Sequence, residues 1–193
     1  MSKVNANING LKFEQKTRLL DTIKKTNLFK VEQLKTSYGK KVAPSYCFGN
    51  IFDKKTDKHI AKVLNALAIY DFLNIDCNIK EKEGVDAKKL ISKGLKPDEV
   101  LINYIDKRIY IIEKKYQEKK GSVDEKLQTI EFKLQQYNRL FRETEFVVRY
   151  MFLLDGKYFN KKIYNDHYKF IINKGCEYYF DEIPLERLGL YAG

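Results

Sequence analysis

Apolar and polar residues follow two different periods along the chain, and the change of period separates predicted helices from predicted strands. Apolar residues at helical spacing predict a helix over Leu11–Asn27 and a second helix over Ile60–Leu73. Tyr38–Lys58, between these two helices, is expected to be a basic loop, and Lys80–Pro97, after the second helix, a charged connection. The first half of the chain is therefore expected to consist mostly of helix and loop.

The period changes after Pro97. Short apolar runs at Val100–Ile105 and Ile109–Ile112 lie on either side of the polar residues 106–108, a pattern typical of a β-hairpin whose strands lie centrally in a sheet. The elements predicted after the hairpin are a helix that opens with a Ser122–Glu125 capping box and continues to Phe141, a strand over Phe146–Leu154, a helix over about Lys161–Asn173, and a strand over Cys176–Phe180. Strands and helices alternate here, so we expect a single α/β or α+β domain over residues 1–193, with a mixed central β-sheet flanked by helices.

The composition is that of a folded protein. Of the 193 residues, 44% are hydrophobic and 13% are aromatic, which excludes a disordered chain. The longest oily region, Val63–Leu73, is too short for a transmembrane helix and is broken by Asn65 and Asp71. The N-terminus lacks the apolar segment of a secretory signal, so we expect an intracellular, cytoplasmic protein with no membrane partner. Three widely spaced cysteines without a CxxC pair indicate reduced thiols, not a disulfide framework or a zinc site.

The charge of the chain is strongly basic. It carries 37 Lys and Arg residues against 26 Asp and Glu residues, a formal net charge of +11. Such an excess favours a polyanionic partner, because each phosphate of a nucleic acid that is neutralised releases condensed counterions. Biased codon usage is the alternative, since the chain is rich in Lys, Ile, Asn and Tyr and has no Trp. The charge therefore favours nucleic acid without establishing it.

Most catalytic schemes lack their residues in this chain. Its two histidines, His59 and His167, are too few for a histidine-bound metal nuclease or a zinc hydrolase. The segment 167–169 begins like the phospholipase D nuclease motif, but Lys174 stands where that motif needs Asp. No GxxxxGK[ST], GxGxxG or GxSxG motif is present, which argues against P-loop, dinucleotide-binding and α/β-hydrolase chemistry. Carboxylates and lysines remain as the groups that carry chemistry.

An acidic residue two positions before a lysine occurs eight times, so this pattern alone says little in a lysine-rich chain. Only Glu113 and Lys115 directly continue an apolar strand that forms one arm of the predicted hairpin. Residues two apart on a strand face the same side, so these two side chains point together. Asp98 opens the other arm, and antiparallel pairing can bring it close to Glu113. The hairpin therefore predicts two carboxylates and one lysine at one end of the sheet.

This grouping suits the hydrolysis of phosphodiester bonds. Two carboxylates can hold Mg²⁺, a hard cation that prefers oxygen ligands. The cation lowers the pKa of a bound water and neutralises charge on the phosphate, and the lysine can orient or deprotonate that water or contact the phosphate. The alternative is a solvated strand end, in which Asp98 follows a proline turn while Glu113 and Lys115 face water. Spacing alone leaves both interpretations open.

The motif itself resembles a known one. Pro97–Asp98, separated by fourteen residues from Glu113–Lys115, is similar to the PD-(D/E)XK motif of the restriction-endonuclease-like nucleases. Three further segments resemble type II restriction endonucleases of this superfamily, namely Ile111–Thr129, Asn9–Glu14 and Tyr178–Leu190. The similarity runs through most of the chain in order, with Tyr38–Lys93 the least covered.

The resemblance implies a restriction-endonuclease-like core and a role for each matched residue. Asp98 and Glu113 would bind the catalytic Mg²⁺, for which Mn²⁺ can substitute, and the backbone carbonyl of Lys114 would be a further ligand. Lys115 would activate the attacking water. Glu14 would join the metal site directly or through a water, with an ordinary acid in the first turns of a helix as the alternative.

Further contacts with the substrate are expected outside this cluster. Gln117 is a candidate for a phosphate or water contact, and a plain surface amide is its alternative. We also expect the basic loop to form part of the DNA-contacting surface, although an ordinary solvated loop explains it equally well. The lysines of this loop are Lys40, Lys41, Lys54, Lys55 and Lys58.

The expected function is that of a Mg²⁺-dependent type II restriction endonuclease, which cuts specific sequences in double-stranded DNA. Cutting both strands with one active site per chain requires two copies, so we expect a homodimer on a palindrome, or a heterodimer whose partner reads the sequence. The resemblance also implies a companion methyltransferase and a bacterial or virus-encoded origin. Two alternatives stay open: another DNA nuclease of the superfamily that acts in nicking, repair or junction resolution, and a DNA-binding module without catalysis. The intact Asp98, Glu113 and Lys115 argue against the second.

Overall fold

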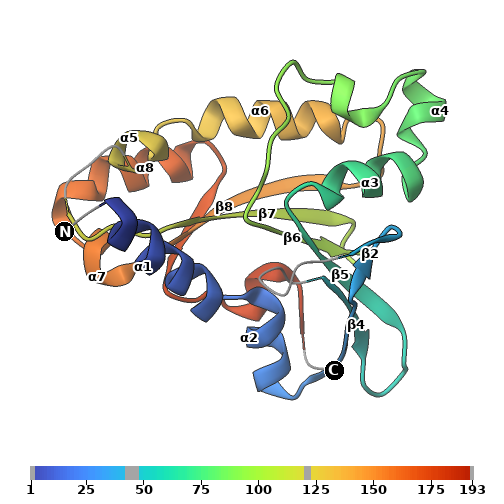
Figure 1. Cartoon of the computed structure of the whole chain (residues 1–193), viewed down its shortest axis with the longest axis horizontal. Helices are drawn as coiled ribbons and strands as arrows, with labels where there is room; N and C mark the ends of the chain where they lie inside the picture. The colour runs from blue at the N-terminus through green and yellow to red at the C-terminus, as the bar shows by residue number, and fades with distance from the viewer. Residues whose placement is uncertain (1–2, 42–47, 120–122, 192–193) are drawn as a thin grey trace.

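A central β-sheet with helices on both faces makes up the fold (Figure 1). The computed structural model describes residues 3–41, 48–119 and 123–191. Within these residues the main sheet has seven strands in the spatial order β1-β4-β5-β6-β7-β8-β9. The strands are β1 (Phe29–Gln33), β4 (Gly49–Asp53), β5 (His59–Asn65), β6 (Glu99–Asn103), β7 (Arg108–Lys115), β8 (Val147–Leu154) and β9 (Glu177–Phe180).

The sheet is mixed. Neighbouring strands from β1 to β7 are antiparallel, whereas β7, β8 and β9 run parallel to one another. The parallel strands are joined by crossovers that contain helices, because parallel neighbours need a long connection. Two short strands, β2 (Thr36–Ser37) and β3 (Lys40–Lys41), form a separate antiparallel ribbon. The observed architecture confirms the predicted α/β fold class with a mixed central sheet flanked by helices.

Helices cover the two faces of the sheet with separate hydrophobic clusters. One face packs against α3, α4, α6, α7 and α8, and the other packs against α1, α2 and the C-terminal residues 183–190. Figure 1 shows α3 and α6 above the sheet and α2 below it. The helices are α1 (Lys3–Lys16), α2 (Leu19–Thr26), α3 (Ala68–Ile75), α4 (Ile79–Glu83), α5 (Val123–Leu127), α6 (Ile130–Leu140), α7 (Gly156–Phe159) and α8 (Asn165–Asn173), with 3-10 turns at Ala87–Lys89, Lys162–Tyr164 and Leu185–Leu188.

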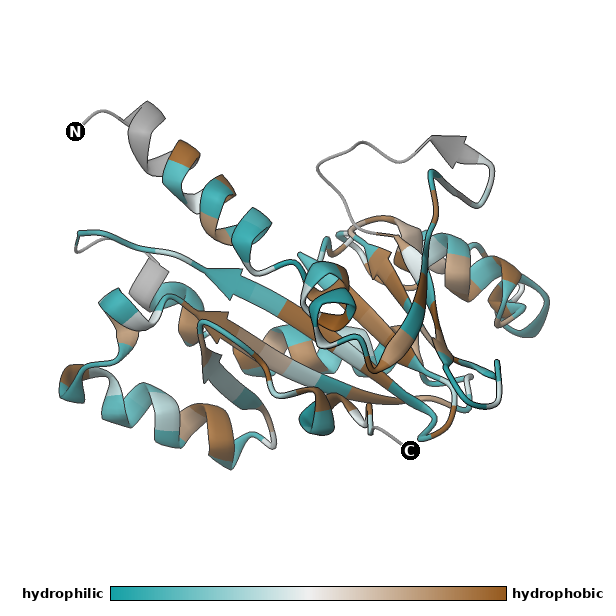
Figure 2. Ribbon diagram, turned by 90° about the horizontal axis from the view of Figure 1, so that it is seen from below, coloured by the Kyte–Doolittle hydropathy of each residue, from teal (hydrophilic) through white to brown (hydrophobic). Residues whose placement is uncertain are grey.

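Strand β7 links both clusters and leads to the charged end of the hairpin. Ile109 and Ile111 are buried on the α6 side of the sheet, whereas Tyr110 and Ile112 are buried on the α2 side. Side chains alternate between the faces of a strand, so an uninterrupted apolar run indicates a strand that is covered on both sides. The last three residues of β7 are charged, and the arrow of β7 turns from brown to teal at its end beside α1 (Figure 2).

The predictions for the second half of the chain are confirmed by the structure. β6 and β7 form the predicted hairpin, and β8, α8 and β9 lie where the pattern placed them. The helix predicted after the capping box is present as α5 and α6, with a turn between them. Ser122, the first residue of that capping box, lies outside the described residues.

The helix predicted over Ile60–Leu73 is wrong in its first half. β5 occupies His59–Asn65, and α3 begins only at Ala68. Ala61 is buried on one face of the sheet and Leu64 on the other. The apolar spacing fits both periods over so short a run, and antiparallel pairing with β4 and β6 decides in favour of a strand.

The basic loop predicted over Tyr38–Lys58 is also partly wrong. Strand β3 lies within it, and so does all of β4, which pairs with β1 and β5. Residues 42–47 lie outside the described residues. Among the described residues of this range, the turn at Tyr38–Gly39 and the exposed turn between β4 and β5 keep the loop character that the sequence indicated.

Helices α1 and α2 replace the single helix predicted over Leu11–Asn27. The break falls at Thr17 and Arg18, where backbone groups bond to side chains of the hairpin. The carbonyl oxygen of Thr17 accepts a hydrogen bond from Lys114 Nζ at 2.8 Å, and the N–H of Leu19 donates to the carboxylate of Glu99 at 3.1 Å. Buried charged side chains therefore end one helix and begin the next.

Two further observations concern the class of protein. In the part of the chain that the structure describes, no helix has the length and apolar character needed to cross a membrane. Cys77 and Cys176 are both buried free thiols, and Cys47 lies outside the described residues.

Candidate active site at the end of the β6–β7 hairpin

The hairpin brings Asp98, Glu113 and Lys115 together. The ammonium nitrogen of Lys115 lies 2.8 Å from Glu113 Oε2 and 3.8 Å from Asp98 Oδ2. The same nitrogen donates to the backbone carbonyl oxygen of Lys114 at 3.0 Å. The register explains the meeting, because Glu99 pairs with Ile112 and the next residue on each strand is Asp98 or Glu113. Oxygens from three residues therefore surround one positive charge.

Glu113 is the most enclosed carboxylate of this cluster. Its side chain is 7% exposed, and a second lysine contacts it from α6, with Lys133 Nζ 3.1 Å from Glu113 Oε1. Burial opposes ionisation of Glu113, but the positive charges of Lys115 and Lys133 outweigh burial and lower its pKa. Glu113 is therefore a carboxylate at neutral pH, with one lysine on each oxygen.

Asp98 has the opposite electrostatic balance. Its side chain is 29% exposed, and its Oδ2 accepts the backbone N–H of Lys114 at 2.6 Å. Burial raises the pKa of Asp98, and the negative charge of Glu113 raises it further. The positive charge of Lys115 lowers this pKa but does not outweigh the other two effects, so the pKa of Asp98 is raised overall. The charge of Asp98 is incompletely neutralised, so this carboxylate favours an additional cation.

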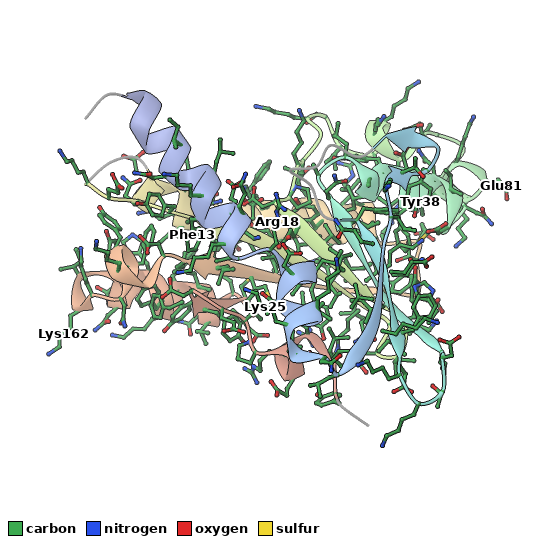
Figure 3. The ribbon with its side chains drawn as sticks, turned by 60° about the horizontal axis from the view of Figure 1, so that its bottom comes forward. Phe13, Arg18, Lys25, Tyr38, Glu81 and Lys162 are labelled. Carbon is green, nitrogen blue, oxygen red and sulfur yellow. The ribbon has the colours of Figure 1, made fainter. Side chains whose placement is uncertain are left out.

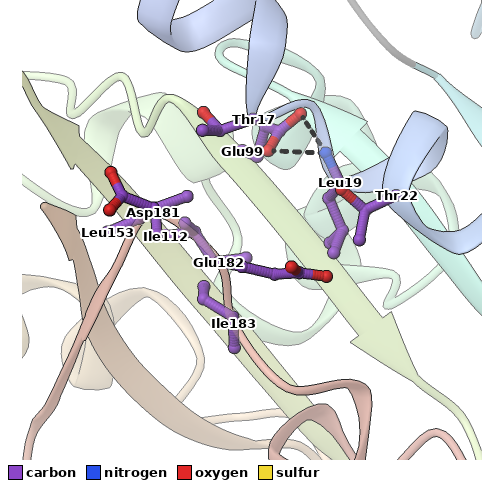
Figure 4. Close-up of a pocket in the computed structure, with 9 residues that line it drawn as sticks. All are labelled: Thr17, Leu19, Thr22, Glu99, Ile112, Leu153, Asp181, Glu182 and Ile183. Atoms are coloured by element: carbon purple, nitrogen blue, oxygen red, sulfur yellow. Dashed lines mark hydrogen bonds between the residues drawn. The ribbon is translucent and has the colours of Figure 1, made fainter. Parts of the chain in front are cut away.

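A buried ion pair on the opposite face of β7 anchors the site. Lys114 Nζ lies 2.7 Å from Glu99 Oε2, and the two side chains are 2% and 8% exposed. Lys114 also donates to the carbonyl oxygens of Glu14 at 3.2 Å and Thr17 at 2.8 Å, while Glu99 accepts the N–H of Leu19 (Figure 4). A cavity of about 10 Å³ beside Glu99 has room for roughly one water. The pair thus ties the end of α1 and the start of α2 to the hairpin.

This anchoring places Glu14 near Asp98, at the wall of an open cavity. The cavity has a volume of about 250 Å³, and Glu14, Arg18, Asn65, Lys96 and Asp98 are among the residues that line it. Burial raises the pKa of Glu14, and the negative charge of Asp98 raises it further. Arg18 lies at the junction of α1 and α2 (Figure 3). The cavity connects Glu14 and Asp98 to solvent and carries cationic side chains on its wall.

The oxygen atoms of this cluster fit a hard divalent cation. The carboxylates of Asp98 and Glu113 and the carbonyl of Lys114 are ligands of the kind that Mg²⁺ prefers. The ammonium group of Lys115 lies among the three oxygens and stands in for the charge of such a cation. Among the described residues, no three His, Cys, Asp or Glu side chains gather closely enough to hold a metal ion by themselves. A complete ligand shell would therefore need the carbonyl and waters, or a movement of Glu14 from α1.

Gln117 lies just beyond this cluster, after the end of β7. Its side chain is half-buried, and its amide group donates to the carbonyl oxygen of Lys119 at 2.5 Å. Gln117 therefore follows Lys115 by two residues in the chain, and its amide group bonds to the backbone of Lys119.

The lysines of the predicted basic loop lie in two separate places. Lys40 and Lys41 form β3. The turn between β4 and β5 carries three exposed lysines, which are Lys54, Lys55 and Lys58. β5 runs from this turn to Asn65, which pairs with Glu99 at the site end of β6. The turn lysines therefore lie at the opposite end of β5 from the carboxylates.

Sequence reasoning missed Lys133 and Glu99. Lys133 follows Ile130 by three residues and precedes Tyr137 by four, and both of these neighbours are fully buried. A lysine within the apolar stripe of a helix indicates that its charge has a partner inside the fold, and this signal was present in the sequence. Glu99 is an acid within a buried strand, and such a group needs a partner. The sequence does not say which of its many lysines provides that partner.

The comparisons with known proteins bear on the same region. A family model described as a PD-(D/E)XK nuclease superfamily domain matches residues 30–165. The match covers most of the 193 residues and contains Asp98, Glu113 and Lys115, whereas Glu14 lies before it. The searches of curated proteins and of solved structures found no match.

Proposed function

The chain belongs to the PD-(D/E)XK nuclease superfamily, and on this premise we propose that it is a Mg²⁺-dependent type II restriction endonuclease. It hydrolyses phosphodiester bonds at specific sequences in double-stranded DNA. One observation carries the proposal: the Lys115 ammonium lies among oxygens of Asp98, Glu113 and Lys114, so the hairpin has built a site for positive charge next to an open cavity.

Each residue of the cluster has a role in this proposal. Asp98, Glu113 and the carbonyl of Lys114 hold the divalent cation that superfamily members generally use, typically Mg²⁺, and Glu14 contributes from α1. When bound, the cation neutralises charge on the phosphate and makes water a stronger nucleophile. Lys115 presents its ammonium group to the scissile phosphate and the attacking water from the same side of β7.

The charge of the protein and the open cavity support DNA as the substrate. The net charge of +11 favours a polyanion. The cavity that leads to Asp98 carries Arg18 and Lys96, and cationic side chains supply most contacts with DNA phosphates. One active site per chain cuts one strand, so we propose that two copies act together on a palindromic site.

The test of this proposal is the cleavage of supercoiled plasmid DNA by the purified protein with Mg²⁺ or with EDTA. We expect linear product with Mg²⁺, no product with EDTA, and a loss of at least about 100-fold in rate for Lys115→Ala and for Asp98→Ala. Lys88→Ala is the matched control, because Asp86 and Lys88 form the same acid-x-lysine pattern away from the hairpin, with Lys88 exposed. This variant should cut like the wild type.

The outcomes separate the proposal from its alternatives. Plasmid that stays supercoiled over a wide range of Mg²⁺ and Mn²⁺ concentrations would contradict nuclease activity. Unchanged cutting by both active-site variants would contradict the assignment of the residues. Nicked plasmid without linear product, or a preference for branched or mismatched DNA, would favour a nicking, repair or junction-resolving nuclease. Activity that appears only with a second subunit would identify the chain as the cleavage subunit of a heterodimer.

A further inference from the structure

Two tyrosine hydroxyl groups are buried in the core without a hydrogen-bond partner. Tyr137 on α6 is 0% exposed, and Tyr150 on β8 is 1% exposed. Within the part of the chain that the structure describes, neither hydroxyl oxygen has a partner. Burial of a hydroxyl without a hydrogen bond costs folding free energy. Phenylalanine would therefore be the more stabilising residue at each position, unless the hydroxyls act in another state of the site.

Both tyrosines come from the elements that contact Glu113. α6 carries Lys133, which contacts Glu113 Oε1, and Tyr137 lies one helical turn later on the same face. β8 carries Phe152 opposite Glu113 in the register, and Tyr150 lies two residues earlier on the same face. The rings of Tyr137 and Tyr150 are 5.9 Å apart. The two tyrosines therefore belong to the buried layer that supports Glu113.

The charges of the site reach both hydroxyl groups. Burial raises the pKa of Tyr137 and of Tyr150, and the negative charges of Glu113 and Asp98 raise these pKa values further. Each hydroxyl therefore keeps its proton at neutral pH and can donate a hydrogen bond to a carboxylate. A carboxylate offers about four lone-pair positions, whereas Glu113 has one lysine on each oxygen. Two donors without acceptors thus belong to the same buried layer as an acceptor with unused capacity.

We propose that Tyr137 and Tyr150 are positioning residues, whose hydroxyl groups donate hydrogen bonds to Glu113 when the site holds its divalent cation. This inference rests on the proposed function. Glu113 is held by two ammonium groups, and the ammonium group of Lys115 would be repelled from these oxygens if they held a divalent cation. Glu113 then loses a donor, and the two hydroxyls are uncommitted donors in the same buried layer. Carboxylates that bind metals are generally held in place by such second hydrogen bonds.

The experiment compares Tyr137→Phe and Tyr150→Phe with the wild type by thermal unfolding of the full chain, first without metal and then during titration with Mn²⁺ in the absence of DNA. We expect the metal-free midpoint to stay the same or to rise, because an unpaired hydroxyl is removed. We expect the Mn²⁺ concentration for half-maximal stabilisation to increase about 10-fold. Tyr104→Phe is the control, since Tyr104 lies in the hairpin turn, at the other end of β7 from Glu113.

Cleavage assays provide a second readout. The rate of the phenylalanine variants should recover at saturating Mg²⁺, which a folding defect would not allow. The same Mn²⁺ affinity in the wild type and both variants would overturn the inference. A lower metal-free unfolding midpoint in both variants would also overturn it, because such a loss would show that the hydroxyl groups already have hydrogen-bond partners. If the wild type cuts DNA but the variants bind Mn²⁺ normally, only this inference fails. If the wild type itself binds neither Mn²⁺ nor Mg²⁺, the proposed cation site fails and this inference fails with it.

Discussion

The buried pair of Lys114 and Glu99 should control the stability of the junction between α1 and α2. Lys114→Met keeps a long apolar side chain but removes the charge, and Glu99→Gln keeps an acceptor for the N–H of Leu19. Each single variant leaves the other charge buried, since the two side chains are only 2% and 8% exposed. We therefore expect each single variant to lose about 3–5 kcal/mol of folding free energy.

The double variant should lose much less than the sum of the two losses, because no unpaired charge remains. What it still lacks is the donor for the carbonyl oxygens of Glu14 and Thr17, an effect of about 1–3 kcal/mol. The expected coupling free energy between the two positions is about 3 kcal/mol or more. A magnitude of this size is a large part of the stability of an ordinary domain.

The assay is equilibrium unfolding in urea at neutral pH, without metal, for the wild type, both single variants and the double variant. The exposed pair Lys107–Glu145, which is equally close at 2.7 Å but has side chains 48% and 61% exposed, provides the control cycle with a coupling close to zero. Additive losses at Lys114 and Glu99 would refute the reasoning, because they would show that neither side chain depends on the charge of the other.

Two further predictions concern single residues. The pKa of Asp98 is raised above its value of about 3.9 in unfolded chains, so its ionisation opposes folding at neutral pH. Asp98→Asn should therefore raise the unfolding midpoint of the metal-free protein at neutral pH, and this gain should shrink as the pH falls toward about 4. The same variant should no longer be stabilised by Mg²⁺. A lower metal-free midpoint at neutral pH would contradict the claim that ionised Asp98 opposes folding. At Gly49, an added Cβ would lie 2.6 Å from the carbonyl oxygen of Glu32 on β1, so Gly49→Ala should lose about 2 kcal/mol in urea unfolding. Gly10→Ala, with nothing within 4 Å of the added carbon, is the control, and an equal loss there would show that the strand contact is not the cause.

The features that could be predicted from the sequence depend on residues close together in the chain. The β6–β7 hairpin follows from two apolar runs and a short turn, and the meeting of Asp98 with Glu113 follows from antiparallel pairing. The common direction of Glu113 and Lys115 follows from the alternation of side chains along one strand. These relations are fixed by backbone geometry over a few residues, so a local pattern contains them.

The features that were missed or wrong depend on partners far apart in the chain. Ile60–Leu73 has apolar spacing compatible with a helix, and pairing with β6, which lies 34–42 residues later in the chain, as well as with the neighbouring β4, turns its first half into β5. The helix predicted over Leu11–Asn27 breaks because Lys114, 97 residues after Thr17, takes a backbone carbonyl. Such contacts depend on which segments the topology brings together, and the pattern of residues within one segment does not specify its distant partners.

The same division holds within the candidate site. From the sequence alone, an apolar strand that ends in charge must present Glu113 and Lys115 on one face and Lys114 on the other. Tertiary structure then assigns their partners: α6 brings Lys133 and Tyr137 to the first face, and the junction of α1 and α2 closes over Lys114 and Glu99 on the second. The physical reason is that the direction of a side chain is a property of its own strand, whereas its electrostatic environment is built by elements that fold against that strand from elsewhere in the chain.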